Sequence, residues 1–354
     1  MNATTETISS AGVLPQDKIA WRRIIEKYRD PSTPRALWQI ANTFIPYVLL
    51  WAAMYWTWHN ALWLTPFLAV LAGLFLVRIF IIFHDCGHGS FLPSRTANTV
   101  VGIVAGILTF TPYYQWRWEH AIHHSTSGHL DKRGIGDIWT MTVQEYLESG
   151  RWKRFAYVLA RNPIVLFVLA PIYMFVVHQR FSTKGSSARE RQSVWWTNLA
   201  LLLMVIGLVN LYGWAGYLVI QLIVSGVGGA AGVWMFYVQH QFEDVYWERG
   251  ENWDYAAAAL RGSSFYKLPA VLQWFSGNIG FHHIHHLSAR IPNYNLQKCH
   301  EADPLFQQVK PLTLWSSFKT LRLRLWDEAS RKLVGYRDLR QLRKQQGQDK
   351  RRSP

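Results

Sequence analysis

The stretch that decides the fold is residues 62–88, LWLTPFLAVLAGLFLVRIFIIFHDCGH, in which a long apolar run ends in a pair of histidines. About 20 apolar residues are enough to cross a bilayer as a helix, and this run is that long. His84 and His88 are four residues apart, so they share one face of a helix. The segment predicts a membrane helix that carries two imidazoles at one end.

Two further clusters repeat this pattern downstream, HAIHH at 120–124 and HHIHH at 282–286. In each, the first, fourth and fifth residues lie on one helix face. His283 points elsewhere and is not expected to be a ligand. Eight imidazoles exceed what one metal ion takes, so the clusters predict two transition-metal ions. The expected ligands are His84, His88, His120, His123, His124, His282, His285 and His286.

The choice of metal depends on the chemistry that the site performs. Imidazole suits zinc, copper, iron and nickel, so the ligand type alone does not select the ion. Zinc does no redox chemistry. A substrate that reaches the site from the bilayer would be an inert hydrocarbon, whose C–H bonds require activated oxygen. Iron is therefore favoured over zinc, with copper left open.

Four apolar runs predict membrane helices in two hairpins. The first pair is 37–58 and 62–83, and the second is 195–212 and 214–238, which meet at Gly213. This arrangement places both termini and all three clusters on one side of the membrane. Arginine and lysine in the N-terminal segment favour the cytoplasm for that side.

Two shorter apolar segments are expected not to cross as simple helices. If residues 98–110 crossed, the first two clusters would lie on opposite sides of the bilayer, so an interfacial helix is expected there. Residues 155–177 are interrupted by Pro163 and Pro171, which break helices. Basic residues on both sides favour a segment that enters the membrane and returns, although crossing stays open.

Composition narrows the class further. The chain has 354 residues and a formal net charge of +15, but no nucleic-acid-binding motif. The excess of basic residues instead fits the positive-inside rule and attraction to acidic lipids or proteins. The two cysteines, Cys86 and Cys299, form no disulfide framework or zinc pattern, and Cys86 is interpreted as a small buried filler.

Three regions are expected along the chain. They are a cytosolic N-terminal segment at 1–36, a membrane domain at 37–300, and a basic cytosolic tail at 301–354. Residues 18–28 are expected to form an amphipathic surface helix. The tail is expected to be a second one, because leucines alternate there with arginines and lysines at Leu321, Leu323, Leu325, Leu333, Leu339 and Leu342.

The three boxes, HxxxH, HxxHH and HxxHH, resemble those of the integral-membrane fatty acid desaturases. HDCGHGSF at 84–91, GNIGFHHIHH at 277–286 and PNYNL at 292–296 are similar to bacterial acyl-lipid desaturases in particular. The resemblance covers residues 37–300.

The resemblance implies an all-α polytopic fold. It has four transmembrane helices in two hairpins, interfacial helices and a cytosolic histidine-rich cap. It also implies a non-haem centre of two iron ions, O2 as co-substrate, and a place in the inner (plasma) membrane with the active site and both termini cytoplasmic. His240 matches a further family ligand at the end of the last span. Phe236 stands where some members have an asparagine.

Acidic residues near the boxes are candidates for holding the imidazole rings, since ligand histidines donate their second N–H to such groups. Glu119 and Glu243 lie nearby, but the expected partners are Asp137, Asp85 and Asp244. No catalytic residue beyond the metal centre is expected.

The predicted function is an O2-dependent desaturase that introduces a cis double bond into lipid-linked acyl chains. A hydroxylase or ketolase on the same scaffold is the alternative, because both reactions begin with removal of a hydrogen. A metal transporter is disfavoured, since its ligands would lie at mid-span rather than at span ends.

Electrons are expected from a separate protein. The sequence has no cytochrome b5 segment and no Gly-rich dinucleotide fingerprint. An acidic ferredoxin or flavodoxin would dock on a basic cytosolic face. The candidate contacts are Arg151, Lys153, Arg154, Arg189 and Arg191.

Overall fold

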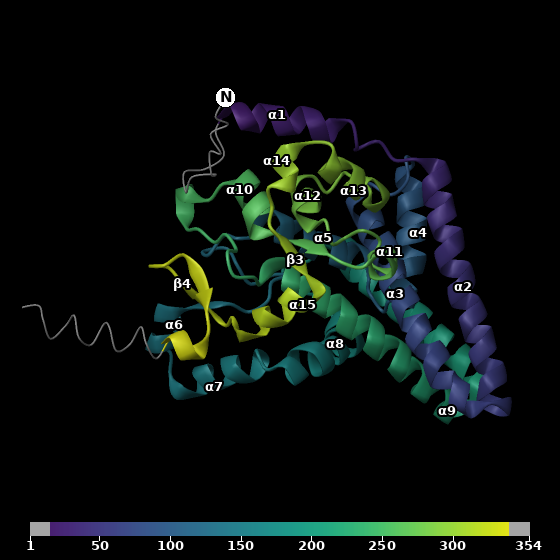
Figure 1. Cartoon of the computed structure of the whole chain (residues 1–354). Coiled ribbons are helices and arrows are strands. Elements are labelled where there is room, and N and C mark those ends of the chain that lie inside the picture. Colours follow the sequence, from purple (N-terminus) through teal and green to yellow (C-terminus); the bar gives the residue numbers. More distant parts are fainter. Residues whose placement is uncertain (1–14, 340–354) are drawn as a thin grey trace, which may run out of the picture.

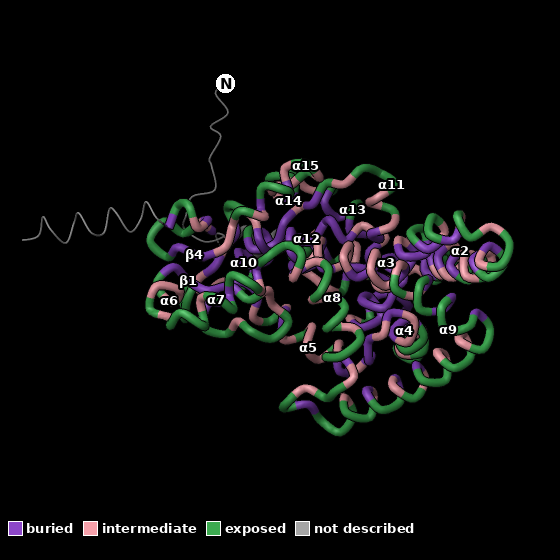
Figure 2. Tube along the Cα trace, turned by 90° about the horizontal axis from the view of Figure 1, so that it is seen from below, coloured by how far each residue is buried: buried purple, intermediate pink, exposed green. Residues whose placement is uncertain are grey.

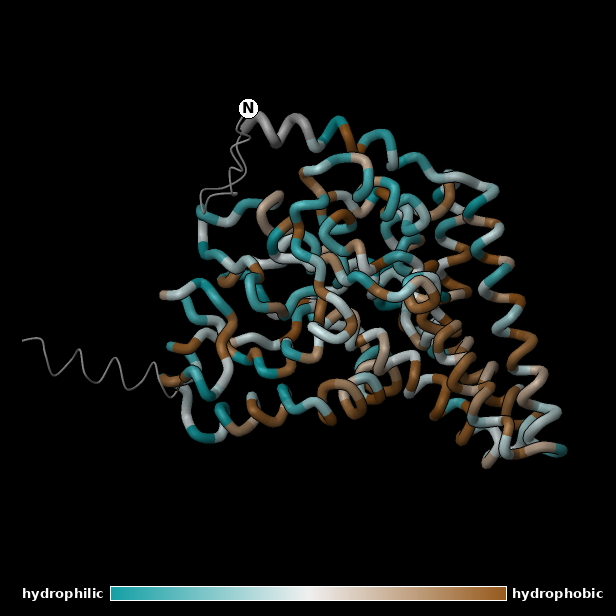
Figure 3. The backbone as a smooth tube through the Cα atoms, in the orientation of Figure 1, coloured by the Kyte–Doolittle hydropathy of each residue, from teal (hydrophilic) through white to brown (hydrophobic). Residues whose placement is uncertain are grey.

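The computed structural model describes residues 15–339 and divides into a bundle of long helices and a cap (Figure 1). Three helical segments are long and apolar enough to span a membrane. They are α2 (Thr33–Asn60), the segment Leu62–His88 that includes α3 (Thr65–His88), and α9 (Ala188–His240). Figure 3 shows hydrophobic residues concentrated along these helices, while the cap is mostly hydrophilic on its outside.

α9 is two helices joined at Gly213, where φ is 71° and ψ is 162°. Both of its ends contact α5 (Tyr113–Thr126): the Tyr114 N–H donates to Ser193 Oγ at 3.1 Å, and His240 Nε2 lies 3.2 Å from His123 Nε2. The two halves therefore run antiparallel as a hairpin, with the expected break at Gly213 forming its tip.

The outer surface of α9 is strongly apolar. Trp195, Trp196 and Leu222 expose 75%, 70% and 63% of their surface, and Figure 2 shows exposed residues along this helix. A soluble protein rarely leaves a continuous apolar face uncovered. The exposed face therefore fits contact with lipid, as in a membrane protein.

α3 lies at the centre of the bundle and packs against α2, α4 (Arg95–Leu108) and α9. Glycine allows the close approach to α9, since a Cβ at Gly73 would lie 2.7 Å from Val227 Cβ. Arg78 of α3 is buried rather than reaching for water. Its Nε donates to Thr43 Oγ1 at 3.1 Å, and its guanidinium lies 3.9 Å from the Trp274 ring centre.

The two shorter apolar segments are bent. α4 and α5 meet at 98°, and α7 (Arg151–Ala160) meets the segment Val165–Arg180 at 65°. The latter segment contains α8 (Ala170–Ile172) between two π-helical turns, Val165–Leu169 and Tyr173–Val177. By length and composition, each pair fits either a broken span or a segment that enters the membrane and returns.

The cap is built from short helices and two small sheets, so the expectation of an all-α fold is correct only for most of the chain. β1 pairs in parallel with β4, β4 pairs antiparallel with β5, and β2 pairs in parallel with β3. The strands are β1 (Met141–Thr142), β2 (Phe265–Lys267), β3 (Pro311–Thr313), β4 (Leu325–Asp327) and β5 (Lys332–Val334). The helices are α6 (Val143–Glu148), α10 (Tyr255–Gly262), α11 (Ala270–Phe275), α12 (His282–Leu287), α13 (Asn293–Glu301), α14 (Pro304–Gln307) and α15 (Leu314–Ser317).

The predicted amphipathic helix of the C-terminal tail is wrong within the described residues. Residues 311–334 instead contain β3, β4 and β5, and Leu325 and Leu333 are buried. Of the leucines expected in the helix, only Leu325 and Leu333 lie in strands, whereas Leu321 lies in a short 3-10 helix, Phe318–Arg322. Leu342 lies outside the described residues.

α1 (Pro15–Glu26) matches the expected N-terminal amphipathic helix, but its apolar face meets protein. Trp21 and Ile25 are buried in a cluster with Leu296 and Phe306 of the cap. The helix thus fastens the start of the chain to the cap, next to the histidine-bearing α12.

Candidate metal centre

Nine buried or half-buried histidines converge where the bundle meets the cap. α3 provides two of them, α5 and α12 provide three each, and the last turn of α9 provides His240. They form two groups, and within each group the candidate ligand atoms lie within 4.8 Å of one another. The first group is His84, His88, His120, His124 and His285, and the second is His123, His240, His282 and His286.

The sequence boxes do not map one to one onto these groups. His124 belongs to the first group, and its neighbour His123 belongs to the second. Adjacent residues project about 100° apart around a helix, so a single turn can reach two ions. α12 divides in the same way, with His285 in the first group and His286 in the second. α5 and α12 therefore join the two halves of the centre.

Asp85 fixes the ring of His84 and ties it to α13. Asp85 Oδ1 lies 3.0 Å from His84 Nδ1, and Asp85 Oδ2 accepts from the Asn293 N–H at 2.6 Å and from its Nδ2 at 2.9 Å. Because both carboxylate oxygens are engaged in a buried site, the orientation of His84 is set by two elements far apart in sequence.

Asp137 plays the same part for His123. Its Oδ1 lies 2.9 Å from His123 Nδ1, and its Oδ2 accepts from the Gly134 N–H at 3.3 Å. Gly136 has φ 72°, and a Cβ there would lie 3.1 Å from His123 Cβ. Glycine is therefore needed for both backbone conformation and space, since side chains rarely adopt positive φ.

The hydrogen bonds leave lone pairs facing one another, which is the arrangement a cation requires. His123 donates through Nδ1 to Asp137, and His240 donates through Nδ1 to the Gly262 carbonyl at 3.2 Å. Each neutral ring then has an unprotonated Nε2, and these two nitrogens are 3.2 Å apart. Two lone pairs at this separation repel without a positive charge between them, so the residues fit a bound metal ion.

Other nitrogen separations agree with shared coordination. His282 Nε2 lies 3.0 Å from His240 Nε2, and His285 Nε2 lies 3.0 Å from His124 Nε2. Two imidazole nitrogens each about 2.1 Å from one ion and at a right angle are roughly 3.0 Å apart. His88 Nε2 and His286 Nε2 are buried without a hydrogen-bond partner among the described residues.

Burial also keeps the α12 rings in the form that binds metal. It lowers the pKa values of His282, His285 and His286 well below their usual range, and neighbouring histidines lower them further. Neutral imidazole is the ligand form of histidine, so these rings are ready to coordinate at neutral pH.

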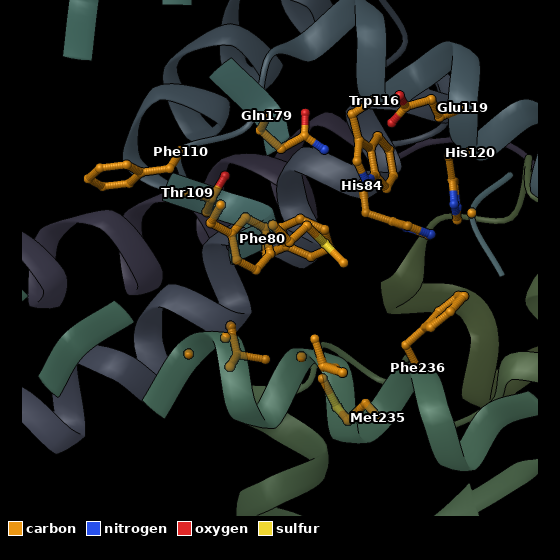
Figure 4. A pocket seen from close by; sticks show the side chains of 18 of the residues that line it. Phe80, His84, Thr109, Phe110, Trp116, Glu119, His120, Gln179, Met235 and Phe236 are labelled. Atoms are coloured by element: carbon orange, nitrogen blue, oxygen red, sulfur yellow. The ribbon is translucent and has the colours of Figure 1, made fainter. Parts of the chain in front are cut away.

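A cavity of about 450 Å³ opens beside the first group (Figure 4). His84, His120 and His282 lie in its wall, together with Trp116 and Phe236. The Trp116 ring stacks on His120 at 4.3 Å between centres, and Phe236 packs against His123 at 5.2 Å. A mainly apolar cavity that ends at a cluster of imidazoles is suited to a long hydrocarbon.

Several predicted residues are placed elsewhere. Asp244 is exposed, and the described part of the chain shows no hydrogen bond from it to a histidine of the two groups. α9 ends at His240, and although Gln241 is still buried, Glu243 and Asp244 are both exposed. The basic residues expected to contact a donor fall on two elements. Arg151, Lys153 and Arg154 lie on α7, whereas Arg189 and Arg191 lie at the start of α9.

Four histidines lie outside the three boxes and apart from His240, and the sequence alone favours an interfacial or surface position for each: His59, His129, His178 and His300. His59 and His178 are exposed, as expected. His129 and His300 are buried rather than interfacial or exposed. His300 Nδ1 lies 3.0 Å from His283 Nε2, and burial lowers the pKa of His283 to about 3. His283 is in neither ligand group, as expected, and instead links α12 to α13.

Two partners of the ligands were not predicted. Asn293 and the Gly262 carbonyl lie far in sequence from His84 and His240, the ligands that they help to hold, so no local spacing reveals them. The PNYNL run at 292–296 contains Asn293, but its resemblance to the desaturases does not indicate a role for that residue. Every residue has a backbone carbonyl, so the amino-acid type at position 262 cannot indicate that its carbonyl accepts a hydrogen bond from a ligand.

Comparison with known proteins agrees with this site. The fatty acid desaturase family model matches residues 61–316. The chain is 46% identical over 318 residues to a fatty acid desaturase of Bacillus subtilis (strain 168), which covers 90% of each chain. It is 27% identical over 252 residues to an sn-1 acyl-lipid omega-3 desaturase (ferredoxin) of Nostoc sp. (strain 36), covering 67% of this chain and 66% of that one.

A third relative is similar to this chain at about the same level of sequence identity as the Nostoc protein. The chain is 26% identical over 258 residues to an sn-1 oleoyl-lipid 12-desaturase of Anabaena variabilis, covering 69% of this chain and 70% of that one. The family match covers both ligand groups and the helices that hold them. The chain therefore belongs to the fatty acid desaturase family and is an oxidoreductase.

Proposed function

We propose that this protein uses two iron ions and O2 to introduce a cis double bond into acyl chains that are part of membrane lipids. The observation that carries the proposal is the pair of imidazole groups beside an apolar cavity. All nine histidines are proposed as ligands, with Asp85 and Asp137 orienting them. Asp244 is not proposed to orient a ligand, because it is exposed and contacts no ligand histidine among the described residues.

When bound, the irons would supply the reduction of O2 that makes removal of two hydrogens from adjacent carbons favourable. In the overall reaction, one O2, two electrons and two protons are consumed for each double bond formed, and two water molecules are released. The electrons and protons come from outside the protein. The chain's own residues keep the centre ordered. Asp85, Asp137 and the Gly262 carbonyl hold protons on Nδ1 of three rings, so that each Nε2 faces inward.

The cavity wall positions the acyl chain and limits access of water to the centre. Phe80, Trp116 and Phe236 present rings to the cavity close to the ligand histidines (Figure 4). Holding the hydrocarbon in one extended path brings one pair of carbons to the centre, which is the main contribution a protein makes to such a reaction.

The charge of the wall supports a lipid-linked substrate over an acyl-CoA. The described residues that line the cavity include Glu119 and Asp137 but no lysine or arginine. The several phosphates of CoA would call for basic side chains at the cavity. A glycerolipid ester brings no such charge into the wall, and the names of the Nostoc and Anabaena relatives refer to lipid-bound chains.

The proposed topology has four crossings in the inner (plasma) membrane, with the cap and both termini in the cytoplasm. α2, α3 and the two halves of α9 would form the two hairpins, and the α4–α5 and α7–α8 regions would lie in the cytoplasmic leaflet. The antiparallel course of α9 about Gly213 supports this arrangement.

A ferredoxin or flavodoxin is proposed as the electron donor. Arg151 and Lys153 are exposed on α7, and Arg189 and Arg191 are exposed at the start of α9. Basic exposed residues attract an acidic partner and raise its rate of association. Turnover with a reduced ferredoxin should fall as salt increases, and more steeply in the wild type than in a Lys153→Gln, Arg151→Gln variant. A response to salt that is flat in both would contradict this docking.

The test of the function is the fatty acid profile of a bacterial host that expresses the chain, compared with a His124→Ala variant. A new unsaturated acid in the wild type alone supports the proposal, and mass spectrometry then gives the position of the bond. A new hydroxy or keto acid would instead assign a hydroxylase or ketolase. An unchanged profile, with iron bound and a ferredoxin co-expressed, would contradict an acyl substrate.

A further inference from the structure

One wall of the cavity is a line of small residues on the second half of α9: Ser225, Gly228, Gly229 and Gly232. They are not equivalent. A Cβ at Gly228 would lie 3.0 Å from Leu76 Cδ2, and one at Gly229 would lie 2.9 Å from Pro171 Cβ. A Cβ at Gly232 meets nothing within 4 Å. A side chain at 232 therefore has room to extend into the cavity without displacing a neighbouring helix.

Gly232 stands between the metal centre and the deep part of the cavity. It precedes His240 by eight residues, which is roughly 12 Å along a helix axis. Beyond it the cavity continues toward Ser225 and, on α3, toward Leu76. We call the part of the cavity lined by Leu76, Ser225, Gly228 and Gly229 the α9 limb. It extends toward Gly213, the tip of the hairpin, and so away from the cap.

The polarity of the lining indicates which end of a substrate occupies this limb. The only hydroxyl among the residues that define the limb is that of Ser225, and it already accepts from Gln221 Nε2 at 2.5 Å. Polar side chains elsewhere in the wall, such as Glu119 and Gln179, come from α5 and from the segment before α9. An apolar limb that runs into the bilayer accommodates the methyl end of a chain, because a polar end would lose its hydrogen bonds there.

An independent observation indicates that the cavity takes a ligand with a polar group. Gln179 is only 4% exposed and lines the cavity, yet its Oε1 has no hydrogen-bond partner among the described residues. A buried amide without a partner is costly, so it calls for a polar group of the substrate or a bound water. Figure 4 shows this side chain at the cavity, across from α9.

We propose that Gly232 determines how many carbons lie between the new double bond and the methyl end of the acyl chain. The absence of a side chain at this position keeps the α9 limb open, so that the methyl end passes it. Any side chain at 232 shortens the limb, and fewer carbons then fit beyond the metal centre. This inference rests on the proposed function, since it concerns the same acyl substrate.

The experiment compares Gly232→Ala, Gly232→Val and Gly232→Leu with the same changes at Gly226, in a host fed saturated acids of several lengths. Gly226 is the matched control, because a Cβ there also meets nothing within 4 Å but the residue does not line the cavity. Double-bond positions are assigned by mass spectrometry. The expected result is a progressive decrease, from Ala to Val to Leu, in the number of carbons beyond the double bond, with no change at Gly226.

The decrease can appear in two ways, either as a bond nearer the methyl end or as preference for shorter chains. Unchanged products from Gly232→Val and Gly232→Leu, made at the wild-type level, would overturn the inference. The inference would also be overturned if Gly232→Ala kept its iron but lost unsaturated product equally from substrates of every chain length. If the wild type itself forms no unsaturated acid, the proposed function fails instead, and the two failures are thus distinguished.

Discussion

At the scale of single residues, the chemistry of the centre depends on groups that hold the ligands as much as on the ligands. Each of His84, His123 and His240 has a defined acceptor on Nδ1. These acceptors fix which nitrogen of the ring carries the proton, and they direct the other nitrogen toward the remaining rings of its ligand group. Asp137 has the clearest role, since the glycines before it shape its loop around His123.

Replacing Asp137 with asparagine should weaken the centre without unfolding the protein. Loss of such an acceptor typically reduces metal affinity or activity about 10- to 100-fold. The measurement is iron content per chain after purification, together with the yield of unsaturated acid. Asp244→Asn is the matched control, because Asp244 is exposed and lies apart from the ligand rings. Equal iron content and activity in the two variants would show that Asp137 does not orient a ligand.

The residues that sequence reasoning identified and those it missed differ in a physical way. Eight of the nine histidines could be predicted because helix spacing places them on shared faces, whereas His240 was indicated only by the family resemblance. Asn293 and the Gly262 carbonyl could not, because only the fold brings them to His84 and His240. Asp244 was chosen for closeness in sequence alone, and the chain turns it outward.

At the scale of elements, the decisive features are the ends and breaks of helices. α3 ends at Gly89 in the left-handed conformation directly after His88. α9 breaks at Gly213 with φ 71° and ψ 162°, which is nearly restricted to glycine. The sequence predicted the break at Gly213, because apolar runs lie on both sides of it, but it gave no expectation for Gly89.

Gly213→Ala should destabilise the protein by about 1–3 kcal/mol, because a side chain makes this backbone conformation unfavourable. The expected observation is a lower temperature of inactivation in detergent. Gly207→Ala is the control: Gly207 lies within the first half of α9, and a Cβ there meets nothing within 4 Å. That change should be neutral or slightly stabilising. A Gly213→Ala variant as stable as Gly207→Ala would mean that the break does not depend on glycine.

The tail shows where element prediction failed. Leucines and basic residues together favour an amphipathic helix in the tail, but Leu325 and Leu333 lie in β4 and β5. The backbone N–H and C=O groups of β4 form hydrogen bonds with β5 on one side and with β1 on the other. β1 lies more than 180 residues from β4 in sequence. Such pairing depends on distant partners and has no local signal.

At the scale of the whole molecule, an apolar bundle and a polar cap meet at the metal centre. The cap closes over the ends of α3 and α9, so each ligand group combines residues from both parts. Sequence reasoning predicted this division from the apolar runs and from the need to place all boxes on one side. It could not predict the two sheets of the cap or the depth of the cavity.

The proposed orientation predicts labelling of single introduced cysteines. Asn60 is the exposed last residue of α2, and Gln144 is exposed on α6 of the cap. In spheroplasts, an impermeant maleimide should label Asn60→Cys and not Gln144→Cys. The native cysteines should not react with the maleimide, because Cys86 and Cys299 are fully buried and burial raises the pKa of Cys299 to about 12. Labelling of Gln144→Cys alone would reverse the orientation.

The central claim is a centre of two irons held by nine histidines, and metal analysis of the purified chain tests it most directly. The account predicts two irons per chain in the wild type. It also predicts a marked loss of iron in His88→Ala, from the first group, and in His286→Ala, from the second. Zinc in place of iron, a single ion per chain, or full iron content in both variants would contradict it.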